Sequence, residues 1–257
     1  MKNIISALIA SICIAMLLNV PLVSAQNYDM VSQKVKYYKT ITYYNKNDLL
    51  LNNLNSNLNF IPYSETFEIS EEEYLKASDD NNQNNANPVS SETTYQKMTS
   101  SIYSNGSYYR YKNEMEWKKM PTVRSYDIIA IGFNQSVKLH GNTYFLQEYC
   151  YTNGTCASST SNDSQVFASG AGTTFKLPTG TLSSLKQTFY FDVEKNTSST
   201  IVSQYAFSDY SHAIKTITKE NAKKYSVSRS LGIVLNSSID SYYDVFSVAD
   251  ASWSGTW

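Results

Sequence analysis

Two glutamates, Glu114 and Glu116, are spaced so that their carboxyl groups could act together in catalysis. They alternate with two apolar residues, Met115 and Trp117. Because successive side chains of a β-strand point to opposite faces, both carboxyl groups are expected on one face of a sheet and both apolar side chains on the other. Two neighbouring carboxyl groups can act as general acid and nucleophile, the roles that glycoside hydrolysis requires.

This pair supports two hypotheses. The first is a carbohydrate-active enzyme of the jelly-roll type, in which Glu114 and Glu116 lie over a sugar cleft, although the sequence around them lacks the fuller carboxylate pattern of those families. The second is a solvated sheet face on which the glutamates pair with lysines of neighbouring strands. The second needs nothing beyond ordinary cross-strand pairing, so we assign no catalytic residue.

The remaining polar residues form no known catalytic or metal-binding pattern. His140 and His212 are the only histidines, and neither has metal-ligand spacing to the other or to a cysteine. We expect both to be ordinary polar residues at the ends of strands or loops. A Gly-x-Ser-x-Gly motif is absent, and the run 169–172 (SGAG) follows no phosphate-binding pattern. We therefore expect no metal and no cofactor.

A disulfide is predicted between Cys150 and Cys156, which flank an Asn-Gly turn. Two cysteines around a turn should pair in an oxidising compartment. A three-residue loop over 152–154, with Gly154 left-handed, places Cys150 opposite Cys156, whereas a two-residue turn would place it opposite Ala157. The bridge could be a local staple or could rigidify an exposed tip that contacts a partner, and we favour the staple.

The first 25 residues predict export from the cytoplasm. One positive charge, Lys2, precedes the apolar run 4–20, and Pro21 and the small residues of 23–25 follow it. This is the pattern of a secretory signal peptide, with Gln26 as the mature N-terminus. The alternative is an uncleaved anchor, because the run is near the lower end of the roughly 17–25 residues that span a bilayer. We expect a secreted, extracellular protein.

The composition of the mature chain limits the classes of partner that we expect it to bind. Cleavage removes one of the 21 basic residues and none of the 22 acidic ones, which leaves a formal charge of −2. Nucleic acids and anionic membranes both favour a basic face, so neither is an expected partner. No second long apolar run is present, so stable membrane insertion is not expected after signal cleavage. The full sequence has 22 tyrosines against 9 glycines and 5 prolines, a composition that suits strands and turns that contact water.

The mature chain divides into three predicted parts. Residues 26–77 read as a small mixed α/β or partly ordered segment, with a strand over 35–44 and a helix that begins with a capping box at Ser70. Residues 78–92 (SDDNNQNNANPVSSE) read as a disordered linker, because they hold too few apolar side chains to offset the entropy of ordering.

Residues 93–257 show the signals of an antiparallel β-sandwich with a jelly-roll-like architecture. An Asn-Gly pair at 105–106 predicts a hairpin, and the run 127–133 predicts a strand that is apolar on both sides. The last strand is predicted over 241–253, with Trp253 facing the core. Further strand candidates are 136–140, 143–151, 173–177, 187–193, 199–208 and 225–235.

These patterns favour a secreted, non-enzymatic protein that binds an extracellular glycan or protein. Exposed tyrosines suit such contacts, since they offer area at a low entropic cost. The alternative is the carbohydrate-active enzyme that uses Glu114 and Glu116. A third hypothesis, a pore-forming toxin, rests on the Ser-, Thr- and Gly-rich run 157–185, in which Val166, Phe175 and Leu177 are the only apolar residues that could alternate towards lipid.

Three short segments carry a resemblance. The segments 117–121 (WKKMP), 124–127 (RSYD) and 251–257 (ASWSGTW) resemble those of uncharacterised secreted proteins from Gram-positive bacteria. The resemblance covers the part of the chain after the linker. It implies secretion and a β-rich fold, and implies no activity.

Overall fold

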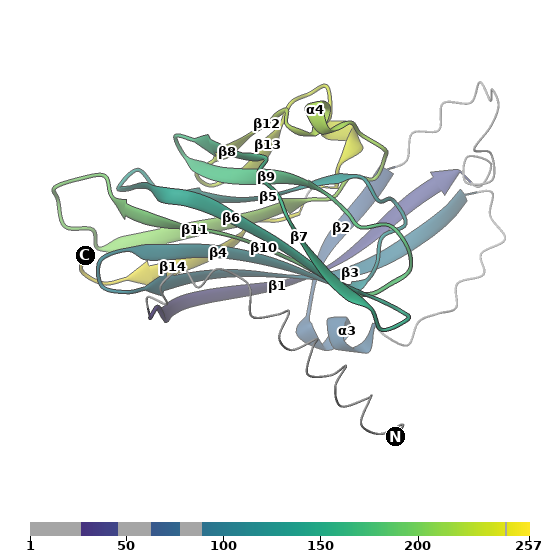
Figure 1. The fold of residues 1–257 in the computed structure, drawn as a ribbon, viewed down its shortest axis with the longest axis horizontal. Coiled ribbons are helices and arrows are strands. Elements are labelled where there is room, and N and C mark those ends of the chain that lie inside the picture. The colour runs from purple at the N-terminus through teal and green to yellow at the C-terminus, as the bar shows by residue number, and fades with distance from the viewer. Residues whose placement is uncertain (1–26, 46–62, 78–88, 245) are drawn as a thin grey trace, which may run out of the picture.

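The computed structural model describes residues 27–45, 63–77, 89–244 and 246–257, and two stacked antiparallel sheets dominate it (Figure 1). The seven-stranded sheet has the order β2 (Tyr63–Ile69), β1 (Asp29–Asn45), β3 (Val89–Ser104), β4 (Tyr109–Lys119), β10 (Leu182–Lys195), β6 (Val137–Tyr151) and β7 (Cys156–Thr160). The five-stranded sheet has the order β14 (Ala249–Ser254), β11 (Ser203–Ser211), β5 (Tyr126–Phe133), β9 (Gly170–Lys176) and β8 (Ser164–Phe167). The other elements are the hairpin of β12 (Tyr225–Ser228) and β13 (Gly232–Leu235), the helices α3 (Glu71–Lys76) and α4 (Lys219–Ala222), and the 3₁₀ turn η1 (Asp240–Tyr242). The predicted all-β sandwich is confirmed.

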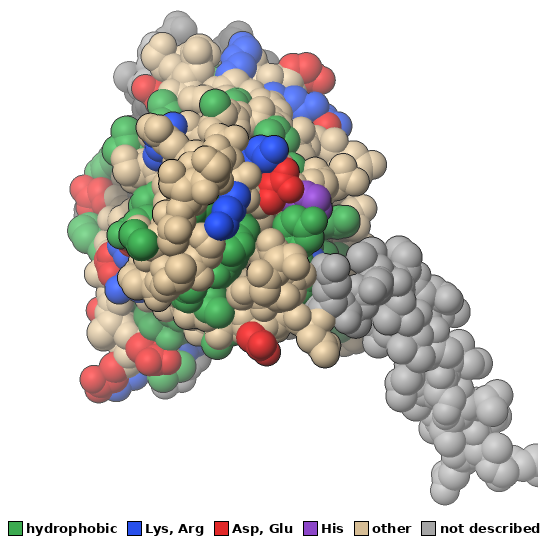
Figure 2. Space-filling view, turned by 90° about the vertical axis from the view of Figure 1, so that its left-hand side faces the viewer, with side chains coloured by type: hydrophobic (Ala, Val, Ile, Leu, Met, Phe, Trp, Pro, Cys, Tyr) green, Lys and Arg blue, Asp and Glu red, His purple; other side chains and the backbone are tan. Residues whose placement is uncertain are grey.

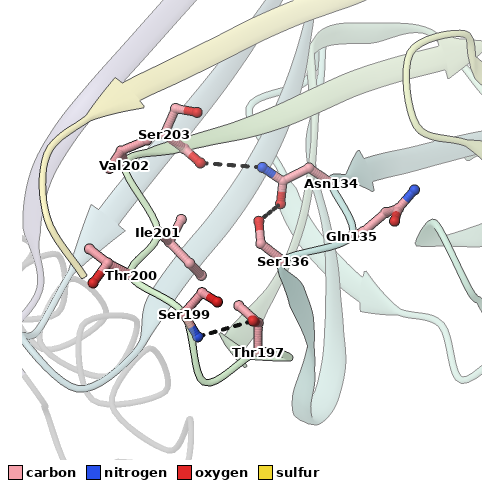
Figure 3. Close-up of a pocket in the computed structure, with 9 residues that line it drawn as sticks. All are labelled: Asn134, Gln135, Ser136, Thr197, Ser199, Thr200, Ile201, Val202 and Ser203. Atoms are coloured by element: carbon pink, nitrogen blue, oxygen red, sulfur yellow. Dashed lines mark hydrogen bonds between the residues drawn. The ribbon is translucent and has the colours of Figure 1, made fainter.

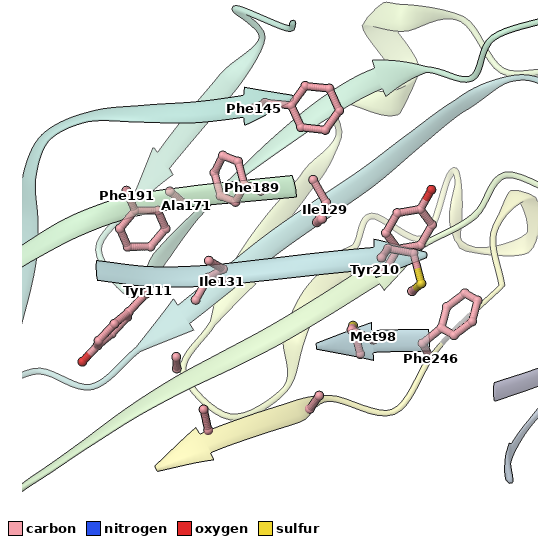
Figure 4. Packing of buried hydrophobic residues seen from close by; sticks show 14 of the residues in the cluster. Met98, Tyr111, Ile129, Ile131, Phe145, Ala171, Phe189, Phe191, Tyr210 and Phe246 are labelled. Atoms are coloured by element: carbon pink, nitrogen blue, oxygen red, sulfur yellow. The ribbon is translucent and has the colours of Figure 1, made fainter. Parts of the chain in front are cut away.

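The main core lies between the two sheets and is rich in aromatic side chains (Figure 4). Strand alternation builds it: on β4, Met115 and Trp117 are buried, as predicted. On the neighbouring strand β10, Phe189 and Phe191 point into the same space. Removing a buried aromatic ring typically costs about 3–5 kcal/mol, so these rings supply much of the stability of the sandwich.

Strand β5 is buried on both faces, as its sequence predicted. Ile129 and Ile131 face the main core, whereas Ile128 and Ala130 belong to a second, smaller cluster. The β12–β13 hairpin covers this second cluster from the outside of the five-stranded sheet. The run 127–133 has no polar face because both of its sides are covered.

Glycines allow the hairpin to approach the five-stranded sheet closely. A Cβ atom added at Gly170 would lie 2.6 Å from Cγ1 of Val227 on the hairpin and would also overlap the carbonyl oxygen of Ile131. We expect Gly170→Ala to lower the free energy of unfolding by about 1–3 kcal/mol, the usual cost of overpacking. Urea denaturation measures this loss. Gly141→Ala is the matched control, because Gly141 has open space around its Cα and should lose only about 1 kcal/mol from its positive φ of 71°. Equal losses in the two variants would contradict close packing of the hairpin.

The segment predicted as a separate N-terminal unit is part of the large sheet. Strand β1 pairs with β3 from Asp29 opposite Ser104 to Asn45 opposite Val89, and β2 pairs with β1. The sheet therefore continues across the boundary predicted at 78–92, and residues 89–92 of that linker lie in β3. Residues 78–88 and the predicted signal peptide lie outside the described residues. The predicted helix after Ser70 is present as α3, and the Ser70 hydroxyl accepts a hydrogen bond from the backbone N–H of Glu73 at 3.1 Å.

The C-terminal strand is shorter than predicted. The run 241–253 was expected to be one strand, but β14 begins only at Ala249, and residues 240–242 form the turn η1. Backbone N–H groups of Ile239 and Asp240 both bond to the carbonyl of Asn236, which turns the chain before it can extend. Trp253 is partly buried at the margin of the core rather than inside it, and Val245 lies outside the described residues.

The middle of the chain contains other differences. The two predicted runs 136–140 and 143–151 form the single strand β6, and the short strands β7 and β8 were not predicted. Of the three apolar residues considered for membrane insertion, Phe175 and Leu177 are buried in the main core and Val166 is exposed. Among the described residues, no helix has both the length and the hydrophobicity that crossing a membrane requires.

The predicted disulfide and its register are confirmed. Cys150 and Cys156 are directly opposite each other at the start of the β6–β7 pairing, with their sulfur atoms bonded and their Cα atoms 4.0 Å apart. Gly154 has a φ of 86°, the left-handed conformation that the three-residue loop requires. The bridge therefore closes a short hairpin at the edge of the seven-stranded sheet.

Candidate functional site

The two glutamates that could have been catalytic lie on the outer face of the seven-stranded sheet, each beside lysines. The Glu114 carboxylate is 2.6 Å from Nζ of Lys186 and 2.9 Å from Nζ of Lys112. Glu116 is 3.7 Å from Nζ of Lys97 and 4.0 Å from that of Lys186. The partners come from β3, β4 and β10, so the charges form a network across three strands.

The charges around Glu114 fit a structural role of this residue better than a role as a general acid. Burial alone would raise the pKa of Glu114, but the hydrogen bonds from Lys186 and Lys112 outweigh it and lower that pKa. A general acid needs a raised pKa so that it holds a proton at neutral pH. The geometry therefore favours the interpretation of Glu114 and Glu116 as members of an ion-paired sheet face.

The two histidines have different surroundings. On β6, His140 stacks on Tyr108 with ring centroids 4.1 Å apart, and its Nδ1 is 3.0 Å from Glu194. His212 follows directly after β11 and is buried beneath the Trp117 ring, whose centroid is 5.0 Å away. His140 has the expected polar contacts at the surface but lies within β6 and not at its end. His212 lies at the end of β11, as expected, but is buried.

His212 belongs to a buried polar cluster around Asp127, which the sequence reasoning missed. The Asp127 carboxylate accepts hydrogen bonds from the Tyr210 hydroxyl at 2.7 Å, from Nδ1 of His212 at 2.9 Å and from the backbone N–H of Ala213 at 3.0 Å. These groups come from β5 and from the end of β11, which are neighbours in the five-stranded sheet. No sequence motif marks them, because 85 residues separate Asp127 from His212.

A second buried carboxyl group, Asp244, lies near this cluster. Its Oδ1 accepts a hydrogen bond from the Ser64 hydroxyl, and Oδ2 is buried and has no hydrogen-bond partner among the residues that the structure describes. Burial raises the pKa of Asp244 to about 7. Within the described ranges, no three His, Cys, Asp or Glu side chains are placed to hold a metal ion.

One end of the sandwich has a pocket of about 470 Å³. Figure 3 shows the residues that line it, and the C-terminal segment lies beside it, since Trp257 pairs with Ile201 of the lining. The pocket lies between the β5–β6 connection and the segment that joins β10 to β11. Loops at the ends of sandwiches commonly carry binding sites, and small-molecule sites usually measure about 300–1,000 Å³. Its lining residues are Asn134, Gln135, Ser136, Thr197, Ser199, Thr200, Ile201, Val202 and Ser203.

Hydrogen bonds hold the walls of the pocket in place. Nδ2 of Asn134 donates to the Ser203 carbonyl at 3.3 Å, and Oδ1 of Asn134 accepts from the Ser136 hydroxyl at 2.7 Å (Figure 3). The backbone of Ile201 exchanges two hydrogen bonds of 3.0 Å with the backbone of Trp257. The pocket is therefore fixed to β11 and to the C-terminal segment.

The lining of the pocket is polar and uncharged. Seven of its nine residues carry amide or hydroxyl groups, and none carries a formal charge. The side chains of Gln135, Ser199 and Thr200 are exposed, and Val202 is 67 % exposed and adds an apolar patch. Figure 2, which views this end of the molecule, shows uncharged polar side chains and backbone over much of the surface, with hydrophobic side chains and scattered charged side chains between them. The guanidinium of Arg229, a charged group outside the lining, lies against the side-chain amide of Gln135.

The outer face of the seven-stranded sheet carries a stack of aromatic and cationic side chains. The Arg110 guanidinium lies 4.3 Å from the ring centroid of Tyr28 and 4.7 Å from that of Tyr190. Tyr190 in turn stacks on Tyr144, with centroids 5.0 Å apart. Asp192 holds the guanidinium through two hydrogen bonds of 2.8 and 3.1 Å. Because both faces of the Tyr190 ring are covered, this stack offers less ring surface to a ligand than its tyrosine content suggests.

No protein-family model matches this chain. No curated protein sequence matches it at a significant level either. The function is therefore inferred from the arrangement of the residues of this chain alone.

Proposed function

We propose that this is a secreted, non-enzymatic protein that binds a neutral glycan in the pocket at the end of the sandwich. The observation that carries the proposal is the composition of the lining, in which amide and hydroxyl groups are abundant and charged groups are absent. Sugar hydroxyl groups donate and accept hydrogen bonds, and amide and hydroxyl side chains can complement both roles. The predicted signal peptide and the disulfide support an extracellular setting.

The pocket also provides the apolar contact that a sugar ring needs. Sugar rings present C–H groups on their faces, and the exposed side chain of Val202 lies among the polar lining residues. Gln135 and Thr200 lie on opposite walls of the pocket, on the β5–β6 connection and on the β10–β11 connection respectively. A ligand between them would contact both connections at once.

Binding to a panel of immobilised neutral oligosaccharides, followed by titration calorimetry with the strongest ligand, tests the proposal. We expect the double substitution of Gln135→Ala and Thr200→Val to weaken binding about tenfold or more, because each lost hydrogen bond contributes about 0.5–1.5 kcal/mol. Glu116→Gln is the matched control, since Glu116 lies on the outer sheet face among lysines, and it should bind as the unsubstituted protein does. Absence of binding to every neutral oligosaccharide, or equal affinity of the double variant, would overturn the proposal.

The same oligosaccharides separate binding from catalysis. Prolonged incubation followed by chromatography of the sugars should recover them intact. Cleavage that disappears in Glu116→Gln would instead support the carbohydrate-active enzyme that uses Glu114 and Glu116.

A further inference from the structure

We propose that two stacked tyrosine pairs on the outer face of the seven-stranded sheet, Tyr144–Tyr190 and Tyr43–Tyr63, are sites of oxidative dityrosine cross-linking. In each pair the residues are directly opposite each other on adjacent antiparallel strands. The ring centroids are 5.0 Å apart with an interplanar angle of 15° in the first pair, and 4.7 Å apart with an angle of 21° in the second. The two phenol rings of each pair are therefore stacked and close to each other.

Both pairs are accessible to a dissolved oxidant. Tyr144 is 39 % exposed and Tyr63 is 49 % exposed, and neither partner ring is buried. The other face of the Tyr190 ring is covered by Arg110 at 4.7 Å. A radical formed on Tyr190 therefore has Tyr144 as its stacked tyrosine partner, which favours coupling within the chain over coupling between chains.

Other tyrosine contacts of the described structure lack this geometry. Tyr37 and Tyr74 are also 5.0 Å apart, but their planes are tilted by 41° and Tyr74 is buried. The rings of Tyr149 and Tyr151 are nearly perpendicular, at 86°. These differences single out the two stacked pairs among the tyrosines whose side chains the structure describes.

The chemistry requires a one-electron oxidant, for which we name hydrogen peroxide acting through a haem peroxidase. Each phenol of a pair loses one electron and its hydroxyl proton, which gives two phenoxyl radicals. The radicals form one carbon–carbon bond between the ring positions ortho to the oxygens, and the two ortho hydrogens then move to the oxygens to restore both phenols. The two electrons and two protons released reduce one hydrogen peroxide to two water molecules. The protein thus loses two hydrogen atoms for each cross-link.

Each cross-link would join two strands that no other covalent bond between side chains connects in the described structure. Tyr144–Tyr190 would connect β6 to β10, and Tyr43–Tyr63 would connect β1 to β2 at the edge of the sheet. The disulfide connects β6 to the strand at the opposite edge, β7. Oxidation outside the cell would therefore join two pairs of strands, β6 with β10 and β1 with β2, that the disulfide does not join.

The test treats the purified, folded chain with hydrogen peroxide and a haem peroxidase. We expect a monomer whose mass falls by two hydrogen atoms per cross-link and which shows the blue fluorescence of dityrosine. Peptide mapping should find Tyr144 joined to Tyr190 and Tyr43 joined to Tyr63. Each of Tyr144→Phe and Tyr63→Phe should remove one cross-link, and together they should remove nearly all monomer fluorescence, while both rings keep their packing.

Tyr205→Phe is the matched control. Tyr205 is similarly exposed, at 37 %, but its ring stacks on Phe207 rather than on a tyrosine, so its substitution should leave the yield unchanged. Undiminished monomer fluorescence in the double variant would overturn the proposal. So would dityrosine that appears only in covalent dimers, or its complete absence from oxidised protein whose circular dichroism shows that it is still folded.

Discussion

Replacement of Asp127 by alanine should lower the free energy of unfolding by about 3–5 kcal/mol, the usual cost of removing one member of a buried ion pair. The Asp127 carboxylate is fully buried and accepts hydrogen bonds from Tyr210, His212 and Ala213. Alanine would leave all three donors without a partner in a region closed to water. Urea unfolding followed by tryptophan fluorescence measures the loss, and Trp117, which packs on His212, contributes to that signal.

Asp127→Asn is the matched variant for this prediction. Asparagine has the same shape and can still accept from the backbone N–H of Ala213, but it carries no charge. We expect it to lose clearly less stability than Asp127→Ala. If Asp127→Ala were within about 1 kcal/mol of the unsubstituted protein, the cluster would not be the structural centre that its hydrogen bonds indicate.

Replacement of Asp244 by asparagine should raise the free energy of unfolding, and the size of this increase should depend on pH. Burial raises the pKa of Asp244 from 3.8 in the unfolded chain to about 7 in the folded protein, which corresponds to at most about 4 kcal/mol. A raised pKa means that this contribution to stability is fully present below about pH 4 and is lost as the pH rises through 7. Asparagine cannot ionise, so Asp244→Asn should be more stable than the unsubstituted protein at pH 8, by an amount that vanishes near pH 4.

Chemical denaturation of both proteins at pH 4.5, 6 and 8 checks this dependence. Two further buried groups act in the same direction in the unsubstituted protein. Burial raises the pKa of Asp209 to about 7. Burial alone would lower the pKa of His212, but the Asp127 carboxylate outweighs it and raises that pKa. Stability should therefore fall as the pH rises from about 4 towards 8 in both proteins, and more steeply in the unsubstituted one. A stabilising effect of Asp244→Asn that is equal at all three pH values would contradict the burial of an ionisable carboxyl group.

Local features of the fold could be predicted because short-range geometry determines them. The Cys150–Cys156 register follows from the length of one turn, and the burial of Trp117 opposite an ion-paired Glu116 follows from the alternation of a strand. The capped helix α3 follows from Ser70 and the residues directly after it. In each case the residues that decide the structure are neighbours in the sequence.

Long-range pairing could not be predicted in the same way. Strand β1 was assigned to a separate segment because the Asn-rich run 78–92 suggests a domain boundary. The sequence of β1 contains no pattern that identifies β3 as its pairing partner. The Asp127–His212 cluster is hidden for a similar reason, since the register of β5 against β11 places its members together. The pocket depends on two connections that are about 60 residues apart, whose Ser, Thr, Asn and Gln residues also occur throughout the chain.

The contact between the first and last strands has a consequence for biosynthesis. Ser247, just before β14, accepts a hydrogen bond from Lys36 of β1, and Phe246 packs on Tyr38 of the same strand with ring centroids 5.2 Å apart. Strand β1 therefore leaves the ribosome long before residues 246–247, which cover part of its inner face, and Ser247 lies 209 residues beyond Tyr38. Translation that stops before residue 246 would leave the Tyr38 ring, which is fully buried in the sandwich, without part of its cover. Truncated chains should therefore aggregate or be degraded instead of accumulating as smaller folded proteins.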